Sequence, residues 1–497
     1  MNTNRKPKTM SPFSPLPLSL QWQEPIAVLG YGAEGKSTLE HLQRWGYKHL
    51  VVLDKNTPSE ALPDGVKGVF GPAYLEALNT DPANEPAIQT IFRSPGIRPF
   101  VTETTTFLPE IEAFIQRGGT LTSQVEAAFE LAGKHRIIGV TGTVGKGTCC
   151  SLLSAMLTEA NITHRLAGNI GVPPLDALYG NALDGNSPLE SDAFLLLELS
   201  SFQLSTLSES PSLAVVLRTT SEHLDWHATQ EEYWDHKANL TRYQNADDVC
   251  IYFADSPGSQ WIGAAGAGRK LAVGTGPTTD VHLSELGIEW AAGEVSLTLA
   301  ETQMTGAFNL ENVGAAAAAA ISLGASPAAV RAGARAFSPL EHRIEFVREI
   351  SGTKAGAGRV RYYNDSYATR PEAALAAVSA LRAYDLGLIL GGSEKHADFA
   401  PMAAAFAKES HLRAIALIGH TAARLEDELR RAGTLEGRAW KRCETLEDAL
   451  EFLRGEISSH GAGGAILLSP ACASFGLFAN YKERGYAFKR LVKALPE

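Results

Sequence analysis

The sequence is poor in cysteine, and the few cysteines are not spaced as a metal or disulfide framework. Five cysteines occur among 497 residues, two of them adjacent at Cys149 and Cys150, and none forms a C-x-x-C pair. A zinc ribbon and a disulfide scaffold are therefore not expected. This cysteine usage is typical of a reducing compartment, and we expect a cytoplasmic location.

Long apolar runs are also missing. Residues 1–20 lack an apolar stretch of signal-peptide length, and we expect them to form a flexible tail. The most apolar stretch, 313–323, is rich in alanine and shorter than the roughly 20 residues that cross a bilayer. No membrane-spanning segment and no membrane partner are predicted.

The chain has no excess of positive charge. Lys and Arg total 44 against 55 Asp and Glu, which gives a formal net charge of −11 at pH 7. A nucleic-acid partner is therefore not predicted. A site for an anionic ligand would need a local concentration of positive charge.

What the sequence does contain is a repeated alternation of short apolar runs with amphipathic stretches. Near the N-terminus the runs 26–29 and 51–53 flank the amphipathic stretch 36–46, a pattern typical of parallel α/β structure. The length of 497 residues suggests roughly three domains. We expect an α/β protein with domains at 21–121, 122–338 and 339–497.

Later apolar runs predict the strands of the second and third domains, because strands buried in parallel sheets are nearly continuous in apolar residues. Helices are expected at 231–242 and 312–323. The predicted strands lie at 136–140, 194–197 and 213–217, and then at 360–363, 386–390, 414–418 and 465–468.

A glycine-rich turn, 30–35, follows the first predicted strand and opens a helix with the letters G-Y-G-A-E-G. Its backbone N–H groups and helix dipole suit an anionic diphosphate. With Asp54 at the end of the next strand, it matches the dinucleotide fingerprint of dehydrogenases. A plain strand–helix turn is the other explanation, because a single G-x-G-x-x-G is a weak signal.

A second glycine loop, V-T-G-T-V-G-K-G-T at 140–148, carries Lys146 where a lysine reaches β- and γ-phosphates. It departs from the usual phosphate loop, because Val140 takes the first glycine position and Gly147 the position of the Mg²⁺-binding hydroxyl. Thr148 is the candidate substitute for that hydroxyl. The strand, loop and lysine together favour a nucleotide site over a flexible turn.

Four further residues suggest catalysis when they are taken with this loop. Glu198 ends an apolar strand, where a carboxylate is costly unless it is paired or binds a metal. His223 and Asp225 follow, and Lys237 lies on the helix predicted at 231–242. Each alone has an ordinary explanation, a solvated histidine or a surface lysine.

An ordered series of segments resembles the muramyl peptide ligases, and among these the glutamate-adding members. The resemblance runs from about residue 26 to the C-terminus. Its segments are T-G-T-V-G-K at 141–146, G-N-I-G at 168–171, L-E-L-S-S-F-Q-L at 197–204, H-L-D at 223–225, N-L-E-N at 309–312, E-H-R at 341–343, N-D-S-Y-A-T at 364–369, G-G-S-E-K-H-A-D-F at 391–399 and L-S-P-A-C-A-S-F at 468–475.

The resemblance implies three domains: a Rossmann-like domain for the UDP part of the substrate, a P-loop-type ATP-binding domain and a Rossmann-like glutamate-binding domain. The first glycine loop would then bind UDP and not NAD. The residues implied to contact the UDP substrate are Gly30, Tyr31, Gly32, Asp54, Lys55, Gly96, Asn169 and His223. Those implied to contact ATP are Gly142, Thr143, Gly145, Lys146, Gly147, Thr148, Asn309, Asn312, Arg343 and Asp365.

The resemblance also implies the catalytic groups and cofactors. ATP and two Mg²⁺ ions are expected, with Lys237 carbamylated by CO₂ to become an anionic metal ligand. The implied metal ligands are Thr148, Glu198, His223 and Lys237, and the implied catalytic residues are Lys146, His223, Lys237 and Asp365.

The implied reaction is an ADP-forming ligation that joins glutamate to UDP-N-acetylmuramoyl-L-alanine in peptidoglycan synthesis. A substrate carboxylate attacks the γ-phosphate, and Mg²⁺ and lysine offset the charge. The glutamate amine then attacks the acyl phosphate. Water must be kept from this intermediate, so we expect the C-terminal domain to close over the nucleotide. The partners of the enzyme would be its small-molecule substrates, and the chain would be a monomer.

The glutamate pocket carries departures from the family pattern. Its implied residues, Thr369, Lys395, Ser474 and Tyr481, supply the cation and hydroxyls that two carboxylates need. Tyr367 stands where a lysine is frequent, Arg370 and a proline follow the threonine, and Tyr481 replaces a common phenylalanine. D-glutamate is favoured by the overall resemblance, and L-glutamate is the alternative.

Two rival functions stay open. Phe308 replaces a histidine that often precedes the N-x-x-N pair, and Gly147 removes a hydroxyl, as in a non-catalytic homologue that binds UDP-muramoyl ligands. A folylpolyglutamate-type ligase is the other rival. The retained Lys146, Glu198 and Lys237 oppose the first, and the first glycine loop opposes the second.

Overall fold

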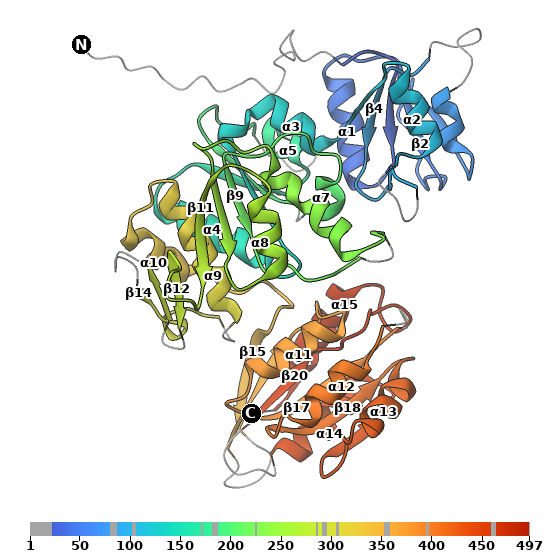
Figure 1. Cartoon of the computed structure of the whole chain (residues 1–497). Helices are drawn as coiled ribbons and strands as arrows, with labels where there is room; N and C mark the ends of the chain where they lie inside the picture. The colour runs from blue at the N-terminus through green and yellow to red at the C-terminus, as the bar shows by residue number, and fades with distance from the viewer. Residues whose placement is uncertain are drawn as a thin grey trace. The chain divides into compact units, whose positions relative to one another are not determined.

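The computed structural model divides the chain into two compact units. One comprises residues 1–298 and 311–337, and the other comprises 299–310 and 338–497. Three sheets form their frameworks (Figure 1). The residues that the structure describes are 22–79, 87–101, 106–169, 172–180, 187–223, 226–284, 287–290, 296–304, 308–351, 358–393, 397–458 and 464–496.

The first sheet has five parallel strands in the order β3-β2-β1-β4-β5. Its central strand is fully buried and wholly apolar, which is why it forms the middle of the sheet. The strands are β1 (Ile26–Leu29), β2 (Leu50–Asp54), β3 (Lys67–Phe70), β4 (Thr90–Arg93) and β5 (Thr120–Thr122), with helices α1 (Ala33–Arg44) and α2 (Pro109–Gln116).

The second sheet belongs to the same unit and has the order β14-β13-β12-β11-β10-β9-β6-β8-β7. Strands β6 to β12 pair in parallel, whereas β12, β13 and β14 form an antiparallel extension. The strands are β6 (Ile137–Thr141), β7 (His164–Gly168), β8 (Phe194–Glu198), β9 (Leu213–Val216), β10 (Val249–Phe253), β11 (Arg269–Gly274), β12 (Val281–Ser284), β13 (Gly287–Trp290) and β14 (Ser296–Leu297).

The longest helices of this part of the chain are α4, α7 and α9, with 14, 13 and 15 residues. Gly333 permits close packing of α10 on α4, because a Cβ there would lie 2.5 Å from Met156 Cα. The helices are α3 (Gln124–Ala132), α4 (Lys146–Glu159), α5 (Pro174–Tyr179), α6 (Ser201–Leu204), α7 (Gln230–Arg242), α8 (Pro257–Ala264), α9 (Phe308–Ser322) and α10 (Pro327–Ala336).

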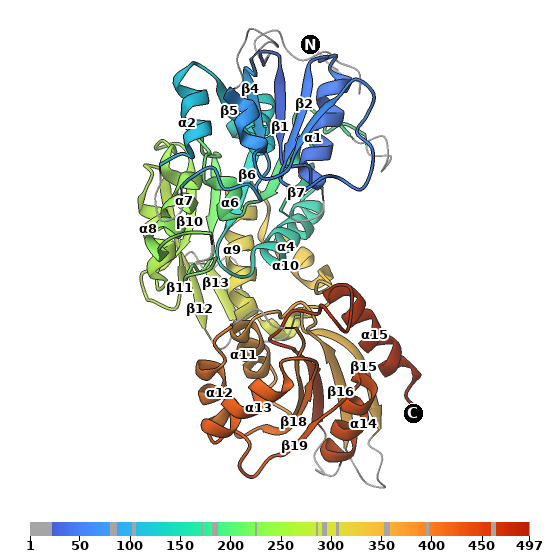
Figure 2. The ribbon, with the colours of Figure 1, turned by 90° about the vertical axis from the view of Figure 1, so that its right-hand side faces the viewer.

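The third sheet forms the second unit and has the order β15-β16-β20-β17-β18-β19, parallel except for the β15–β16 pair. Helices cover both of its faces (Figure 2). Alternate residues of β17 serve two cores, Leu388 on the side of α11 to α13 and Ile389 on the side of α14 and α15. The strands are β15 (Glu345–Ser351), β16 (Arg359–Asn364), β17 (Asp385–Gly391), β18 (Leu412–Ile418), β19 (Ala439–Arg442) and β20 (Gly464–Leu468), and the helices are α11 (Pro371–Ala380), α12 (Ala400–Ala407), α13 (Ala422–Arg431), α14 (Leu446–Ile457) and α15 (Tyr481–Ala494).

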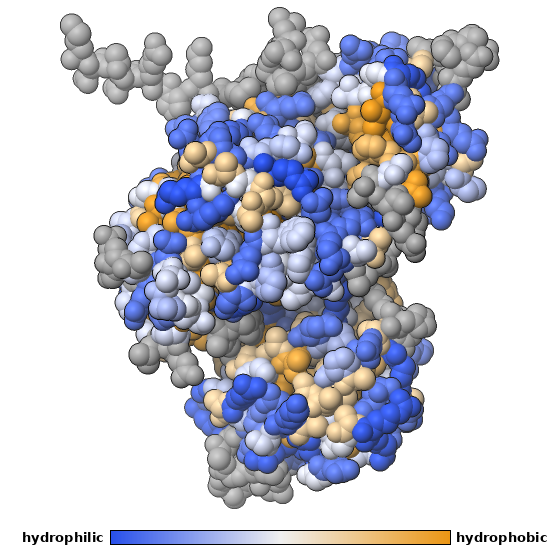
Figure 3. Space-filling model, in the orientation of Figure 1, coloured by the Kyte–Doolittle hydropathy of each residue, from blue (hydrophilic) through white to orange (hydrophobic). Residues whose placement is uncertain are grey.

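The predicted α/β class is confirmed, and the predicted apolar runs lie in strands. The helix expected from residue 312 begins earlier, at Phe308, so that the N-x-x-N pair lies within its first turns. No helix in the described part of the chain is long and apolar enough to cross a bilayer. The face drawn in Figure 3 is mainly hydrophilic, with hydrophobic residues in small separate groups.

Candidate active site

The phosphate loop joins β6 to α4 in the first unit. Gly142 and Gly145 adopt φ angles of 151° and 84°, in the region that favours glycine. A Cβ on Gly145 would lie 2.3 Å from Asn312 Oδ1, so the predicted ATP residue Asn312 packs on the loop. Gly145 caps α4 without a side-chain hydrogen bond. The first N–H groups of α4 and its dipole therefore suit a phosphate.

Two lysines reach this loop from different helices. Lys146 Nζ donates to the carbonyl oxygens of Gly142 and Thr143 at 3.0 and 2.9 Å. Lys237 Nζ, from α7, donates to Thr141 Oγ1 at 3.1 Å and to the Gly142 oxygen at 3.0 Å. Burial lowers the pKa of Lys237 well below its usual range, and the charge of Lys146 lowers this pKa further. Burial of the Lys237 amine therefore disfavours its charged form.

Glu198 ends β8 next to this loop, since Val140 of β6 pairs with it in the sheet. The side chain is 3% exposed, and its Oε1 accepts a hydrogen bond from Asn169 Nδ2 at 2.9 Å. Among the described residues no protein group bonds to Glu198 Oε2, which is buried. A buried carboxylate oxygen without a donor is costly, and Mg²⁺ prefers such oxygen ligands. Glu198 thus fits the predicted metal.

His223 lies on the segment that follows β9. Its backbone φ is 57°, an uncommon value for a residue other than glycine. The ring packs 4.7 Å from that of Phe202, and Nε2 lies 3.8 Å from a carboxylate oxygen of Glu222. Asp225 lies outside the described residues. The roles predicted for His223, as for Thr148 in the first turn of α4, stay predictions.

The first glycine loop joins β1 to α1 and is tied to the neighbouring strand ends. The Asp54 carboxylate accepts hydrogen bonds from the backbone N–H groups of Tyr31 at 2.7 Å and Asn56 at 2.8 Å. A Cβ on Gly35 would lie 2.0 Å from the Gly30 carbonyl oxygen. Helix α1 therefore packs against the loop too closely for a side chain at this position, which is the role of the third glycine of the motif. Asp54 therefore shapes this loop through its two oxygens.

The other predicted UDP residues surround these strand ends. Ser94 Oγ donates to the Gly30 carbonyl oxygen at 2.7 Å, which brings the segment before Gly96 onto the loop. Lys55 and Gly96 are exposed, and no heavy atom lies within 4 Å of a Cβ built on Gly32. Exposure at the carboxyl ends of parallel strands is what a ligand site there requires.

Sequence reasoning missed a buried charged network that joins the first sheet to α6. Arg93 is 2% exposed and donates to the Phe202 carbonyl oxygen at 3.0 Å and to Ser205 Oγ at 3.2 Å. Glu34 Oε2 accepts from Gln203 Nε2 at 3.3 Å, and burial raises the pKa of Glu34 to about 7. An arginine that ends an apolar run is the signal that could have indicated Arg93.

In the second unit, Asp365 follows β16 as a buried acid, 6% exposed. Its oxygens accept hydrogen bonds from the Ile344 N–H at 3.2 Å and from Ser469 Oγ at 2.7 Å. Burial raises the pKa of Asp365 to about 7, although the two hydrogen bonds and Arg343 act in the other direction. A carboxyl group with this pKa can exchange a proton near neutral pH.

Tyr367, the main departure from the family pattern, lies between two predicted ligand-binding residues. The Arg343 guanidinium stacks on its ring at 3.9 Å, and the ring of Tyr481 meets it edge-on at 5.1 Å. The two tyrosines that depart from the pattern are therefore in contact. Tyr367 thus stands at the motif position where a lysine is frequent. Its ring also covers one face of the Arg343 guanidinium.

Arg484, on α15, is a second functional candidate that sequence reasoning missed. It is 1% exposed, and its guanidinium donates to the Ser366 carbonyl oxygen at 2.9 Å and to that of Cys472 at 3.0 Å. It thereby ties the N-D-S-Y-A-T segment to the L-S-P-A-C-A-S-F segment. Ser474 in the latter is buried at 4% and Thr369 in the former is half-buried.

Several predicted residues keep their assignments only as predictions. Lys395 lies outside the described residues. Asn309 is 9% exposed on the first turn of α9, and the binding of ATP by Asn309, Arg343 and Asp365 stays a prediction. So does the binding of glutamate by Thr369, Ser474 and Tyr481.

Backbone conformation sets the motif segments apart. Five described residues other than glycine have left-handed φ angles: His223, His342, Ile344, Ala471 and Asn161. The first four lie in or beside the H-L-D, E-H-R and L-S-P-A-C-A-S-F segments, whereas Asn161 lies in the turn after α4. Such conformations cost of order 1–3 kcal/mol and gather at functional sites.

Family models match both of the later regions. A Mur ligase middle domain matches residues 140–320, and a Mur ligase glutamate ligase domain matches residues 342–472. A UDP-N-acetylmuramoylalanine--D-glutamate ligase of Symbiobacterium thermophilum is 34% identical, over 95% of this chain and 98% of the relative. The chain belongs to the Mur ligase family. Another relative of the same name, from Acetivibrio thermocellus, is 32% identical over 95% of this chain and 96% of its own.

Solved Mur ligase structures share the fold. MurF ligase from Thermotoga maritima in complex with ADP aligns with a TM-score of 0.58 at 15% identity, covering 95% of each chain. UDP-N-acetylmuramate-alanine ligase from the same organism aligns with a TM-score of 0.55 at 14% identity, covering 94% of this chain and 99% of that one. The dehydrogenase explanation of the first glycine loop is thus replaced by membership of the Mur ligase family.

Proposed function

We propose that this Mur ligase is an ATP-dependent, ADP-forming enzyme that joins D-glutamate to UDP-N-acetylmuramoyl-L-alanine in peptidoglycan synthesis. The observation that carries the proposal is the phosphate loop, contacted by Lys146 and by the buried Lys237. At the end of the neighbouring strand lies the Glu198 oxygen, which has no hydrogen-bonding partner among the described residues. The relatives' name and their nearly full-length alignment supply the substrate. We place the reaction in the cytoplasm of the cell and expect a monomer without nucleic-acid or membrane partners.

The first step is attack of the substrate's alanyl carboxylate on the γ-phosphate of ATP. Two anions must approach each other, so the loop N–H groups and the Lys146 ammonium would stabilise the charge. Lys146 now donates to two loop carbonyls, and it would exchange these bonds for phosphate oxygens. A Mg²⁺ ion held by Glu198 would polarise the phosphoryl oxygens.

Lys237 is proposed to act as a carbamate. Its lowered pKa leaves the amine lone pair available, which would attack the carbon of CO₂ while an N–H proton passes to water. The amine thereby becomes an anionic carbamate. This change would give Lys237 the oxygen ligands that Mg²⁺ prefers.

The second step is attack of the glutamate amine on the acyl phosphate, which releases phosphate. The amine must lose a proton, and Asp365 suits the acceptor's role because its pKa is about 7. His223 is the alternative acceptor. L-glutamate is the alternative substrate, because Tyr367 with its stacked Arg343 replaces a lysine where the glutamate pocket is predicted.

The direct test supplies ATP, Mg²⁺ and UDP-N-acetylmuramoyl-L-alanine to the full chain, and offers D- or L-glutamate separately. Phosphate release and the product's mass are measured. We expect product with D-glutamate. Product with L-glutamate alone would reverse the assigned handedness, and no product with either isomer would overturn the proposed reaction.

A further inference from the structure

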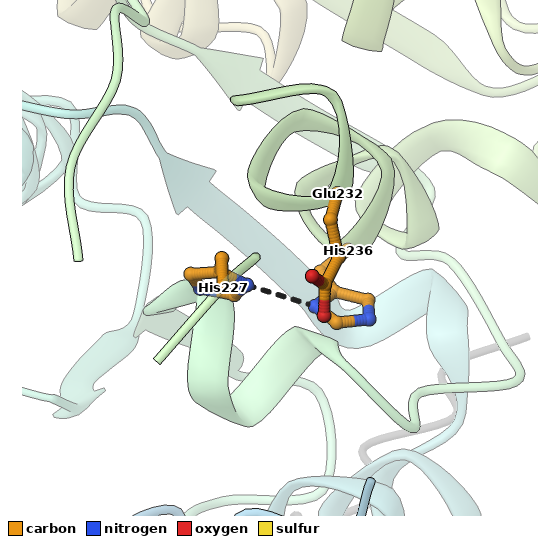
Figure 4. Close-up of side chains that lie close together, drawn as sticks. All are labelled: His227, Glu232 and His236. Carbon is orange, nitrogen blue, oxygen red and sulfur yellow. Dashed lines mark hydrogen bonds between the residues drawn. The ribbon is translucent and has the colours of Figure 1, made fainter. Parts of the chain in front are cut away.

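A separate group of metal-ligating side chains lies in α7 and the segment before it. Within the described residues, His227, Glu232 and His236 each bring a ligand atom to within 4.8 Å of the other two. Figure 4 shows the two imidazoles facing each other, with Glu232 on the same helix as His236. None of these residues belongs to the sites predicted from the sequence.

The spacing of the two histidines already suits a metal ion. His227 Nδ1 and His236 Nδ1 are 3.1 Å apart. Two nitrogen ligands bound tetrahedrally to zinc at about 2.0–2.1 Å are themselves about 3.3 Å apart. Glu232 and His236 are four residues apart on α7, so they lie on one face of the helix. The Glu232 carboxylate would have to move toward the two histidine nitrogens to complete the ligand set.

The hydrogen bonds of the pair leave a lone pair for a metal. In the contact between the two Nδ1 atoms one must accept, so at least one ring is neutral. His227 Nε2 lies 2.9 Å from Ser201 Oγ. When Nε2 carries the proton and donates it to this hydroxyl, Nδ1 keeps its lone pair. Metal-binding histidines make such a hydrogen bond through the ring nitrogen that does not bind the metal. His236 offers a second lone pair once its proton resides on Nε2.

We propose that His227, Glu232 and His236 form a binding site for a divalent transition-metal ion of the zinc class. The two Nδ1 atoms and one carboxylate oxygen would be the ligands, a set that zinc accepts with a fourth position left for water. The proton of His236 would move from Nδ1 to Nε2 through solvent, so ligation needs no net loss of protons. The site is independent of the proposed ligase activity.

Neighbouring groups orient the carboxylate and also oppose the ion. Glu232 Oε2 accepts from the Ala228 N–H at 2.6 Å, and Oε1 lies 3.3 Å from Arg98 Nη2. These bonds hold the carboxylate as outer partners of metal ligands do, while the charge of Arg98 lowers the affinity for a cation. The rival explanation is a buried hydrogen-bonded network without an ion.

One of the three side chains, His236, borders a cavity. His236 lines a space of about 480 Å³ together with Phe100, Asp235 and Asn239. Asn239 Oδ1 is buried without a hydrogen-bonding partner in the described part of the chain. An ion at this site would fasten α7, which carries Lys237, to the segment that follows His223.

The test is a Zn²⁺ titration of the purified full chain against a chromophoric chelator, combined with anomalous diffraction from crystals soaked in zinc. We expect an anomalous peak among the three side chains, with one equivalent of zinc bound there. Zinc should raise the melting temperature of the wild type. Because an ion at Glu198 would add an equivalent, the titration is repeated in Glu198→Ala, which should retain the proposed site.

His236→Gln and His49→Gln form the matched pair of variants. His49 is an exposed histidine of the first sheet, with its side chain 69% exposed. His236→Gln should weaken the bound equivalent by at least about tenfold, whereas His49→Gln should leave it unchanged. Equal affinity in both variants would overturn the site. If His236→Gln does not fold, the wild-type anomalous map decides, and a map without a peak at the three residues overturns the proposal.

Discussion

The two glycine loops of the first unit share a backbone plan and differ in the charges around it. Each joins a buried parallel strand to a helix, β1 to α1 and β6 to α4. The first is held by the carboxylate of Asp54, whereas the second is contacted by the amines of Lys146 and Lys237. The motif alone supplies anion-binding N–H groups in both cases. The side chains around it decide which loop can support phosphoryl transfer.

The largest expected difference between the loops is the effect of removing one lysine from each. Lys146→Ala should lower kcat by about 10³-fold, because the ammonium that stabilises charge during phosphoryl transfer is lost. Steady-state phosphate release measures this, and calorimetry should show that UDP-substrate binding survives.

Lys36→Ala is the matched control in the first loop's helix. Lys36 is exposed and pairs with Glu60 at 3.1 Å, and an exposed ion pair contributes little. We expect kcat within about twofold of the wild type. A loss as large as that of Lys146→Ala would contradict the difference between the loops.

Lys237→Ala should lower kcat by about 10²–10³-fold, because an anionic metal ligand would be lost. If the working group is a carbamate, added short carboxylates should restore part of the activity. Mass spectrometry of the intact protein in the presence and absence of CO₂ provides a second measurement. A variant that no carboxylate rescues would count against the carbamate.

Glycine-to-alanine changes should separate the two loops by substrate. Gly145→Ala puts a Cβ 2.3 Å from Asn312 at a positive φ, and should raise KM for ATP about tenfold at a strain of about 1–2 kcal/mol. Gly35→Ala puts a Cβ 2.0 Å from the Gly30 oxygen, and this clash with the backbone should raise KM for the UDP substrate by at least about tenfold.

Gly455→Ala is the control, because no heavy atom lies within 4 Å of a Cβ at that position. It should leave both KM values unchanged. Equal effects of Gly145→Ala and Gly35→Ala on the two substrates would show that the loops do not act separately.

The smallest expected effect concerns Glu34 behind the first loop. Burial raises the pKa of Glu34 from 4.5 to about 7, so the folded state favours the protonated acid. Stability from this group is fully present below about pH 4.5 and is lost as pH rises to about 7. Glu34→Gln should therefore raise the melting temperature by a few degrees at pH 8, about 1–2 kcal/mol, and leave it unchanged at pH 4.5. Calorimetry at the two pH values measures both, and a gain confined to the lower pH would contradict the sign.

Much of the fold is local enough to be predicted from the sequence. The runs 26–29 and 386–390 lie in buried parallel strands because an apolar run without alternation suits a sheet covered on both faces. The antiparallel extension from β12 to β14 was not predicted. Its last strand has only two residues, too few for a periodic pattern.

The candidate site could be predicted where one segment carries both backbone and side chain, as in the loop with Lys146. It could not be predicted where the partners are distant in sequence. Arg484 joins two segments through buried hydrogen bonds, and Tyr367 meets Arg343 and Tyr481. The low pKa of Lys237 depends likewise on burial against Gly142, which no linear spacing reveals.

The central claim is that the Lys146 loop supports transfer of a phosphoryl group to the substrate carboxylate. The direct measurement uses UDP-N-acetylmuramoyl-L-alanine whose carboxylate carries a heavy oxygen isotope, and follows the label by phosphorus NMR during turnover with ATP and D-glutamate. An acyl phosphate transfers one carboxylate oxygen to the released phosphate. We predict labelled phosphate from the wild type and none from Lys146→Ala. Turnover by the wild type that releases only unlabelled phosphate would contradict the account.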